Sequence, residues 1–203
     1  MTQRIHGEKV FIMKRLLFIL ILTFSFQSLA KADDVREFQI EGMSIGDSLL
    51  DFFSKKKIEK EKFFEAEQGS NKQVARFYIR EKKGNYDWIA ISFKTSDKKY
   101  TIIELSGFIF IPFNKCLIKR DEINKEVENI FNESQKQVTG TTEHFLDKKS
   151  FVNHVAYWTS KTLNDYVSLT CYDWSIESGY EDQLRIEAYS HEYHAWLLSL
   201  QNS

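Results

Sequence analysis

Proline is almost absent from this chain of 203 residues, which contains only one, Pro112. This scarcity argues against a proline-rich linker or a disordered tail. The sequence also lacks a P-loop, a G-x-S-x-G nucleophile elbow and a dinucleotide-binding fingerprint. Its carboxylates are abundant, but no spacing isolates an acid/base pair. Because no motif supports an enzyme class, we expect a protein that is not an enzyme and needs no cofactor.

Basic residues are not in excess. The net charge is −1, with 28 Lys and Arg against 29 Asp and Glu. Removing residues 1–32, which contain five basic residues and one acidic residue, leaves a charge of about −5. Such a surface has no bulk attraction for phosphate backbones, so we expect no nucleic-acid partner.

Cysteine is also scarce, with Cys116 and Cys171 as the only two. A C-x-x-C redox motif is absent. An even count in an exported chain suggests a disulfide, and the alternative is two free buried thiols.

The N-terminal stretch has the pattern of a signal peptide. Lys14 and Arg15 precede the apolar run 16–26, and small residues follow with cleavage expected near Ala30 or Ala32. The alternative is a membrane anchor, but the run is shorter than the roughly 20 residues that a span needs. We therefore expect a periplasmic or secreted protein with no stable membrane anchor after cleavage.

The remaining chain reads as two units. Residues 1–32 are interpreted as the signal peptide, with Met13 as an alternative start and an upstream extension before it. Residues 33–113 and 114–203 each contain a helical pattern followed by strand-like runs, which predicts an α+β fold.

In the first unit, apolar residues at helical spacing predict a helix within 44–53. Ser44 is a good N-cap, and Asp47 three residues later completes a capping pattern. Strand-like runs follow at 74–80, 86–93 and 100–111, the last with Gly107 as an expected bend or bulge. The apolar positions of the helix are Ile45, Leu49, Phe52 and Phe53.

The second unit repeats this order. Residues 119–131 have Ile123, Val127, Ile130 and Phe131 on one helical face. Three strand-like runs follow, at 151–158, 165–174 and 182–190. The helix should cover the apolar side of 165–171, so a disulfide from Cys116 to Cys171 would join helix to sheet.

The two units also match weakly in residues. The stretch 87–93 corresponds to 165–171, and Ile103-Glu104 corresponds to Ile186-Glu187. This pattern favours an internal repeat, and the alternative is coincidence between half-buried strands. We predict two related units of a helix followed by antiparallel strands, with the helices packed on one face of the sheet or sheets.

The words "IEGMSIGDSLLDFFS" at 40–54, the lysine-rich turn after them and "TCYDW" at 170–174 resemble an uncharacterised family of exported marine bacterial proteins. The helix start Gly42-Met43-Ser44 resembles that of BamE-like envelope lipoproteins, although the lipidated cysteine of that family is missing. The doubled layout resembles the β-lactamase inhibitory protein. These resemblances imply an exported helix-plus-sheet module and assign no functional residue.

Alternation along the strands separates two faces. If the aliphatic positions pack under helices, the other face carries aromatic residues, charged residues and small hydroxyls, a mixture that suits a protein interface. We call it the aromatic face and expect a non-catalytic binding module for an envelope or secreted protein. The alternative is cross-strand ring pairing that only stabilises a solvated sheet. The candidate binding residues are Trp88, Glu104, Tyr166, Tyr172, Trp174, Glu187 and Tyr189.

Two other functions are weighed against this one. The first is a carrier of a small apolar ligand, held between helices and sheet by Phe52, Phe53, Phe108 and Phe110. The second is a metal-dependent enzyme at His191 and His194, which share a face only on a helix. No third ligand is evident from spacing, so we expect no metal.

Overall fold

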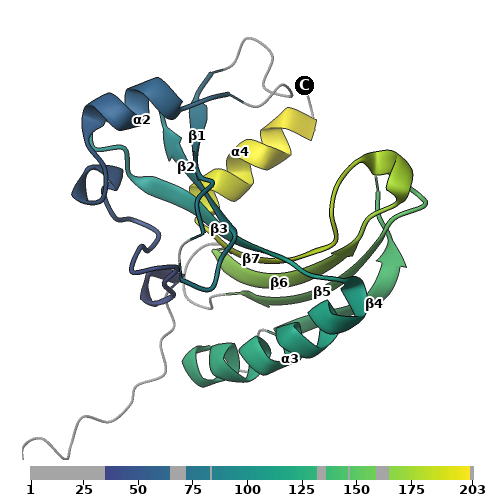
Figure 1. The fold of residues 1–203 in the computed structure, drawn as a ribbon. Coiled ribbons are helices and arrows are strands. Elements are labelled where there is room, and N and C mark those ends of the chain that lie inside the picture. The colour runs from purple at the N-terminus through teal and green to yellow at the C-terminus, as the bar shows by residue number, and fades with distance from the viewer. Residues whose placement is uncertain are drawn as a thin grey trace, which may run out of the picture. The chain divides into compact units, whose positions relative to one another are not determined.

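Seven antiparallel strands form one sheet in the order β1-β2-β3-β7-β6-β5-β4 (Figure 1). The structure is a computed structural model that describes residues 35–64, 72–82, 84–131, 136–145, 147–158 and 165–201. The predicted signal peptide lies outside the described residues. The strands are β1 Val74–Ile79, β2 Trp88–Lys94, β3 Ile102–Phe110, β4 Lys136–Glu143, β5 Phe151–Trp158, β6 Tyr166–Asp173 and β7 Gln183–Tyr189.

The two faces of the sheet differ as alternation predicted. The aliphatic face packs against α3 (Phe113–Ile130), α2 (Lys55–Glu61) and the segment before α2, and this packing forms the main core. Ile89 and Ile91 point into this core, and Cys171 and Ile186 join them from β6 and β7. We call it the α3 face. The protein is therefore α+β, with α3 lying along one side of the sheet (Figure 1).

The prediction that all helices pack on one face is wrong for α4 (His191–Gln201). Tyr193 and Trp196 of α4 pack on Ile103 and Tyr189, on the opposite side of the sheet. The pairing of β2 with β3 skips Ile103, because Ser92 pairs with Glu104 while Phe93 pairs with Ile102. This bulge turns an extra apolar side chain toward α4. We call this side the α4 face; it is the predicted aromatic face.

The predicted helix at 44–53 is absent. The structure has a short 3₁₀ turn at Leu49–Asp51, followed by α2. Gly46, at φ +94°, donates its N–H to Ile102 O at 2.9 Å, and the Leu49 N–H donates to Tyr100 O at 3.1 Å. Because these N–H groups bond to the chain entering β3, they are not available for a helical ladder. The Ser44–Asp47 contact still forms, from the Ser44 N–H to Asp47 Oδ2 at 2.8 Å.

The second predicted helix begins earlier than its apolar pattern indicates. α3 starts at Phe113, directly after Pro112. Proline suits a helix start because it lacks an N–H that the helix would leave unpaired. The Phe113 N–H donates to Asp182 Oδ2 at 3.2 Å. Val127 and Phe131 are buried, as their spacing predicted.

The predicted Cys116–Cys171 disulfide is present, with Cα atoms 5.8 Å apart. Cys116 lies in the first turn of α3 and Cys171 in β6, and both are fully buried. The bond joins helix to sheet in the second half of the chain, as predicted.

Strand β4 was not predicted, because its sequence "KQVTGTTE" has little apolar alternation and its residues are mostly exposed. It is an edge strand paired only with β5 among the described strands. The halves meet where β3 pairs with β7, so they share one continuous sheet. In the described residues the first half has the 7-residue α2 where the second half has the 18-residue α3, and it has no counterpart of β4. The internal repeat remains a prediction.

Gly107 makes neither a bend nor a bulge, since it pairs in regular register with Ile89 and Ile186. A Cβ at this position would lie 2.3 Å from the ring of Tyr86. The glycine therefore lets an aromatic ring lie against the strand.

Candidate functional site

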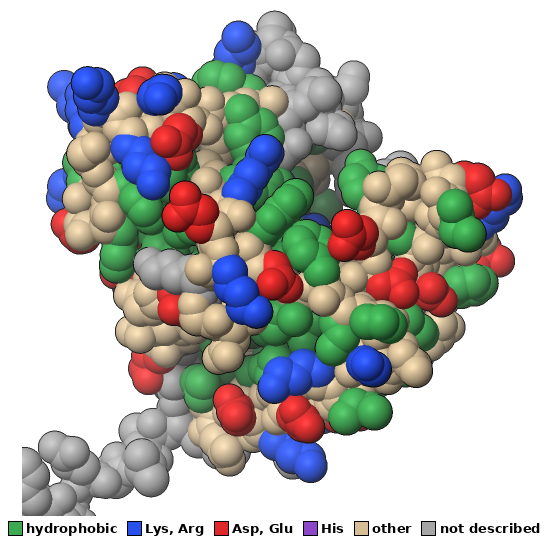
Figure 2. Space-filling view, in the orientation of Figure 1, with side chains coloured by type: hydrophobic (Ala, Val, Ile, Leu, Met, Phe, Trp, Pro, Cys, Tyr) green, Lys and Arg blue, Asp and Glu red, His purple; other side chains and the backbone are tan. Residues whose placement is uncertain are grey.

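The α4 face contains an open groove of about 870 Å³ beside the part that α4 covers. Figure 2, in the orientation of Figure 1, views the sheet nearly edge-on and shows hydrophobic side chains among charged ones across the middle of the visible surface. Two aromatic walls enclose the groove, and arginine side chains line it between them. The first wall consists of Tyr78, Trp88, Phe108 and Phe110, and the second of His144, Phe145, Tyr172, Trp174 and Tyr180.

The first wall is built by strand alternation. Phe108 and Phe110 are two residues apart on β3 and point to the same side. The Trp88 ring packs edge-on against Phe110, with centroids 5.1 Å apart, and lies 6.5 Å from Tyr78. The Arg80 guanidinium lies over the rings of Tyr78 and Trp88 at 5.3 and 5.6 Å. These contacts hold the rings in place and add a cation at this wall.

The second wall combines the end of β6 with two connections. Tyr172 and Trp174 stack almost in parallel, with centroids 5.3 Å apart. Tyr180 lies 4.9 Å from Trp174 on one side, and His144 lies 4.7 Å from it on another. Asp147 ties the two connections together, because its Oδ2 accepts hydrogen bonds from Ser150 Oγ at 2.5 Å and Ser175 Oγ at 2.6 Å.

The floor between the walls presents guanidinium groups. Arg76 of β1 and Arg185 of β7 line the groove together with Gln183. The Arg185 guanidinium lies 5.1 Å from the centroid of the Phe108 ring. Arg76 Nε donates to Ser92 Oγ at 3.1 Å, and its Nη2 donates to Tyr193 of α4 at 2.5 Å. The floor therefore joins the strands to α4.

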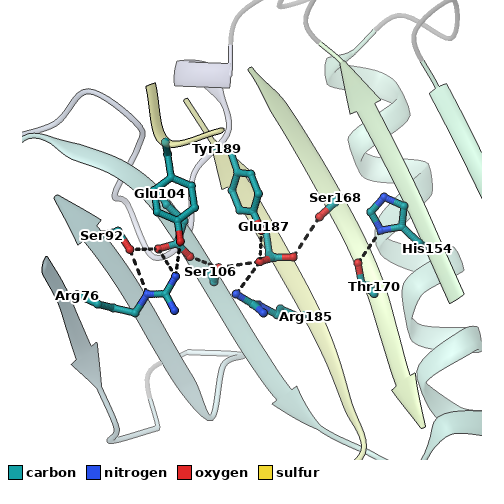
Figure 3. Close-up of polar contacts among 11 residues, drawn as sticks. Arg76, Ser92, Glu104, Ser106, His154, Ser168, Thr170, Arg185, Glu187 and Tyr189 are labelled. Carbon is teal, nitrogen blue, oxygen red and sulfur yellow. Dashed lines mark hydrogen bonds and ion pairs between the residues drawn. The ribbon is translucent and has the colours of Figure 1, made fainter. Parts of the chain in front are cut away.

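Two buried glutamates pair with these arginines (Figure 3). Glu104 Oε2 lies 3.5 Å from Arg76 Nη2, and Glu187 Oε1 lies 2.7 Å from Arg185 Nη2. The Ser106 hydroxyl lies within hydrogen-bonding reach of both carboxylates. Tyr189 OH donates to Glu187 Oε1 at 2.7 Å. We call this set of residues the floor network.

Both arginines remain charged. Burial is the largest single influence on the pKa of Arg76 and would lower it, but Glu104, together with smaller contributions from Tyr193 and Tyr78, raises the pKa above its ordinary value. The same balance holds for Arg185, whose pKa the Glu187 carboxylate raises against the effect of burial. The groove therefore has permanent cations at its floor.

Glu104 and Glu187 form a carboxylate pair that sequence spacing did not reveal. They come from adjacent strands, and the only sequence signal is the matching Ile-Glu dipeptide in the two halves. Neither carboxylate is among the side chains that line the groove. Because each bonds to serine hydroxyls and an arginine, the pair is suited to positioning the guanidinium groups rather than to reacting with a substrate.

The residues predicted from the sequence fall into three places. Trp88, Tyr172 and Trp174 line the groove. Glu104 and Glu187 lie beneath it in the floor network. The other two, Tyr166 and Tyr189, form a cross-strand pair with centroids 4.4 Å apart, and both belong to the cluster that packs with α4.

Several groove residues were missed. Arg76 and Tyr78 alternate with buried Ala75 and Phe77 on β1, and this alternation was a usable signal. Tyr180, His144 and Phe145 come from connections, for which periodicity makes no prediction.

The four phenylalanines proposed to hold an apolar ligand do not share one site. Phe53 packs against Phe77 on the α3 face, with centroids 5.0 Å apart. Phe108 and Phe110 line the groove on the opposite face. The sheet lies between Phe53 and these two residues, and Phe52 is 37% exposed. The predicted cavity between helices and sheet is therefore not formed by these residues.

His191 and His194 both lie on α4, as a shared metal site would require. The His194 ring packs near Trp158 and Tyr166. Across the described part of the chain, no group of three or more His, Cys, Asp or Glu side chains is arranged to hold a metal ion.

A pH-dependent stability is expected from His154, whose Nδ1 lies 2.8 Å from Thr170 Oγ1. Burial lowers its pKa below the ordinary 6.5, against the opposing effect of Glu187. The folded state therefore resists protonation of His154, so stability is complete above the ordinary pKa and falls as the pH drops below it. We expect the free energy of unfolding to decrease between about pH 7.5 and about pH 5.5.

Urea unfolding of the wild type and of His154→Gln at several pH values tests this expectation. The variant can still bond Thr170 but does not titrate, so its pH dependence should be weaker. His144, whose pKa burial also lowers, should account for part of the remaining slope. Identical slopes for the two proteins would show that His154 is not responsible.

No protein-family model matches this chain, and neither the curated proteins nor the solved structures contain a match. Within the described ranges, no helix is both long enough and apolar enough to span a membrane.

Proposed function

We propose that this protein is a non-catalytic binding module that recognises a peptide or a segment of a partner protein in the groove of the α4 face. The main observation in support is the open groove of about 870 Å³, which is lined by rings from both halves of the sheet. Ligand sites commonly occupy about 300–1,000 Å³. Aromatic residues and arginine are the side chains enriched in binding surfaces, because they supply large contact areas at low entropic cost.

The exposed rings at the rim of the groove favour a macromolecular partner over a small ligand. Phe145 is 75% exposed and Tyr180 is 68% exposed, and both line the groove. Large exposed rings beside a groove are typical of a surface that another chain covers. A small ligand in the groove would leave much of these rings in water.

We further propose that the protein acts in the periplasm or outside the cell, with an envelope or secreted protein as its partner. The basic, apolar and small-residue order of the first 32 residues supports export. The Cys116–Cys171 disulfide supports an oxidising compartment.

A carrier of a small apolar ligand is the second candidate, now placed in the groove rather than between helices and sheet. The observation in its favour is the hydrophobic lining by Trp88, Phe108 and Phe110. Organic extraction of purified protein followed by mass spectrometry would detect a bound apolar compound if the protein is a carrier.

Replacing Trp88 tests the proposed binding function. We expect Trp88→Ala to weaken binding of peptides selected from a random library by about 2 kcal/mol or more, roughly thirtyfold, because a large ring in the wall is lost. Binding is measured by the change in tryptophan fluorescence or by fluorescence polarisation of labelled peptides.

Phe151→Ala is the matched control, because Phe151 has the same exposed fraction as Trp88, 38%, but does not line the groove. Both variants should unfold at nearly the wild-type urea concentration. Equal peptide binding by the two variants would contradict a binding role for the groove.

A further inference from the structure

The chemistry of the groove floor is cationic although the floor network is neutral as a whole. The Arg76 and Arg185 side chains are 13% and 22% exposed, whereas those of Glu104 and Glu187 are 0% and 5% exposed. An occupant therefore meets the guanidinium groups and not the carboxylates that neutralise them. The other charged residues of the lining, Asp147, Glu177 and Glu181, come from the β4–β5 and β6–β7 connections and not from the floor strands. Charge complementarity therefore favours an anionic or strongly accepting group at the floor.

Two residues that line the groove each carry a buried donor with no acceptor among the described residues. The donors are Arg185 Nε and Trp174 Nε1. A buried donor without an acceptor costs free energy. An acceptor carried into the groove, with a small rotation of these side chains, would satisfy both.

The cationic floor and the apolar walls are immediate neighbours. The Arg185 guanidinium lies 5.1 Å from the ring centroid of Phe108, which belongs to the first wall. A ligand that uses both must carry its acceptor and its apolar group on the same or adjacent atoms. In a polypeptide, the α-carboxylate of the last residue and the side chain of that residue branch from one carbon and meet this requirement.

We propose that the groove binds the C-terminal residue of a partner polypeptide that ends in a large apolar side chain. This inference rests on the proposed function. The α-carboxylate accepts hydrogen bonds from Arg185 and Trp174, and the side chain lies between the two aromatic walls. The chain then leaves across the exposed rings of Phe145 and Tyr180, which explains why these rings surround the opening.

The test uses pools of random hexapeptides that end in Phe, Leu or Gly, each as the free acid and as the C-terminal amide. Fluorescence polarisation with the full disulfide-bonded protein should show free acids ending in Phe or Leu binding about tenfold or more tightly than their amides. Pools ending in Gly should bind more weakly than the pools ending in Phe or Leu, because glycine has no side chain to place between the aromatic walls.

Two variants test whether Trp174 and Arg185 are the donors that bind the carboxylate. Trp174→Phe keeps an aromatic ring but removes the Nε1–H, and Arg185→Lys keeps the charge opposite Glu187 but removes the planar donor group. Both should reduce the preference for acid over amide. Arg120→Lys is the control, because the Arg120 side chain on α3 is 11% exposed and does not line the groove.

The outcomes separate this inference from the proposed function. Equal binding of acids and amides would overturn carboxylate recognition and leave a groove that binds internal peptide segments. Binding of 3-phenylpropionate without binding of any pool would assign the site to a small aromatic acid and overturn both proposals. A preference for acid that persists in Trp174→Phe and Arg185→Lys would place the carboxylate elsewhere and overturn the inference.

Discussion

Replacing both Cys116 and Cys171 by alanine is expected to lower the free energy of unfolding by about 4 kcal/mol, on the chain-entropy model. The two residues are 55 positions apart in the sequence, so the bond closes a long loop in the unfolded chain. Its removal gives the unfolded state more conformations, while α3 and β6 lose their covalent connection. The effect is large beside the total stability of a domain, about 5–15 kcal/mol.

Urea unfolding of the wild type with and without reductant measures this effect separately from the cavities that alanine leaves. The double variant should unfold at the same urea concentration in both conditions, which makes it the control for reductant. A decrease below about 1 kcal/mol in the reduced wild type would show that the loop between the cysteines is already restricted in the unfolded chain.

Arg185→Leu is expected to destabilise the protein by about 3–5 kcal/mol, because it leaves Glu187 as a buried charge without its cation. The Glu187 side chain is 5% exposed, and Arg185 is its closest ion-pair partner, at 2.7 Å. Its hydrogen bonds from Tyr189 OH at 2.7 Å and from Ser106 and Ser168 at 3.4 Å each come from uncharged donors. They do not replace a positive charge in a buried site.

The double variant Arg185→Leu with Glu187→Leu should recover at least half of this loss, because the unpaired charge is removed together with its partner. Chemical unfolding of the wild type, both single variants and the double variant gives the coupling energy of the pair. A double variant no more stable than Arg185→Leu would contradict this account. The double variant should also lose most of the preference for free acids over amides, since its floor carries no donor at position 185.

The positions of most strands and the two faces of each were predictable, because each half-buried strand repeats its apolar residues every second position. Ile89 and Ile91 on β2 were correctly separated from Trp88 and Ser92. Apolar spacing of 3.6 residues likewise identified the buried face of α3. The disulfide was predicted because the chain contains two cysteines and because Cys171 lies on the strand face that the second helix covers.

The errors arose where distant segments decide local structure. Ile45 and Leu49 have helical spacing, but the backbone beside them bonds to the chain that enters β3. β4 has almost no pattern of its own and is defined by pairing with β5. The position of α4 follows from a bulge at Ile103 that no local rule predicts.

The candidate site likewise has residues that the sequence predicted and residues that it did not. Trp88, Tyr172 and Trp174 were found because strand alternation assigns each to a face. Tyr180 and His144 were not, because they lie in connections whose paths depend on Asp147 and its serine partners.

The sequence by itself determined the α+β class, the two faces of the strands, the buried side of α3 and the residues that form the disulfide. These features depend on the periodicity and composition of short segments. Only the tertiary structure decided that α4 covers part of the aromatic face, that two glutamates lie beneath two arginines, and that the rest of the face becomes a groove. The reason is that strand register, a bulge and the packing of connections bring together residues more than a hundred positions apart, such as Arg76 and Tyr193.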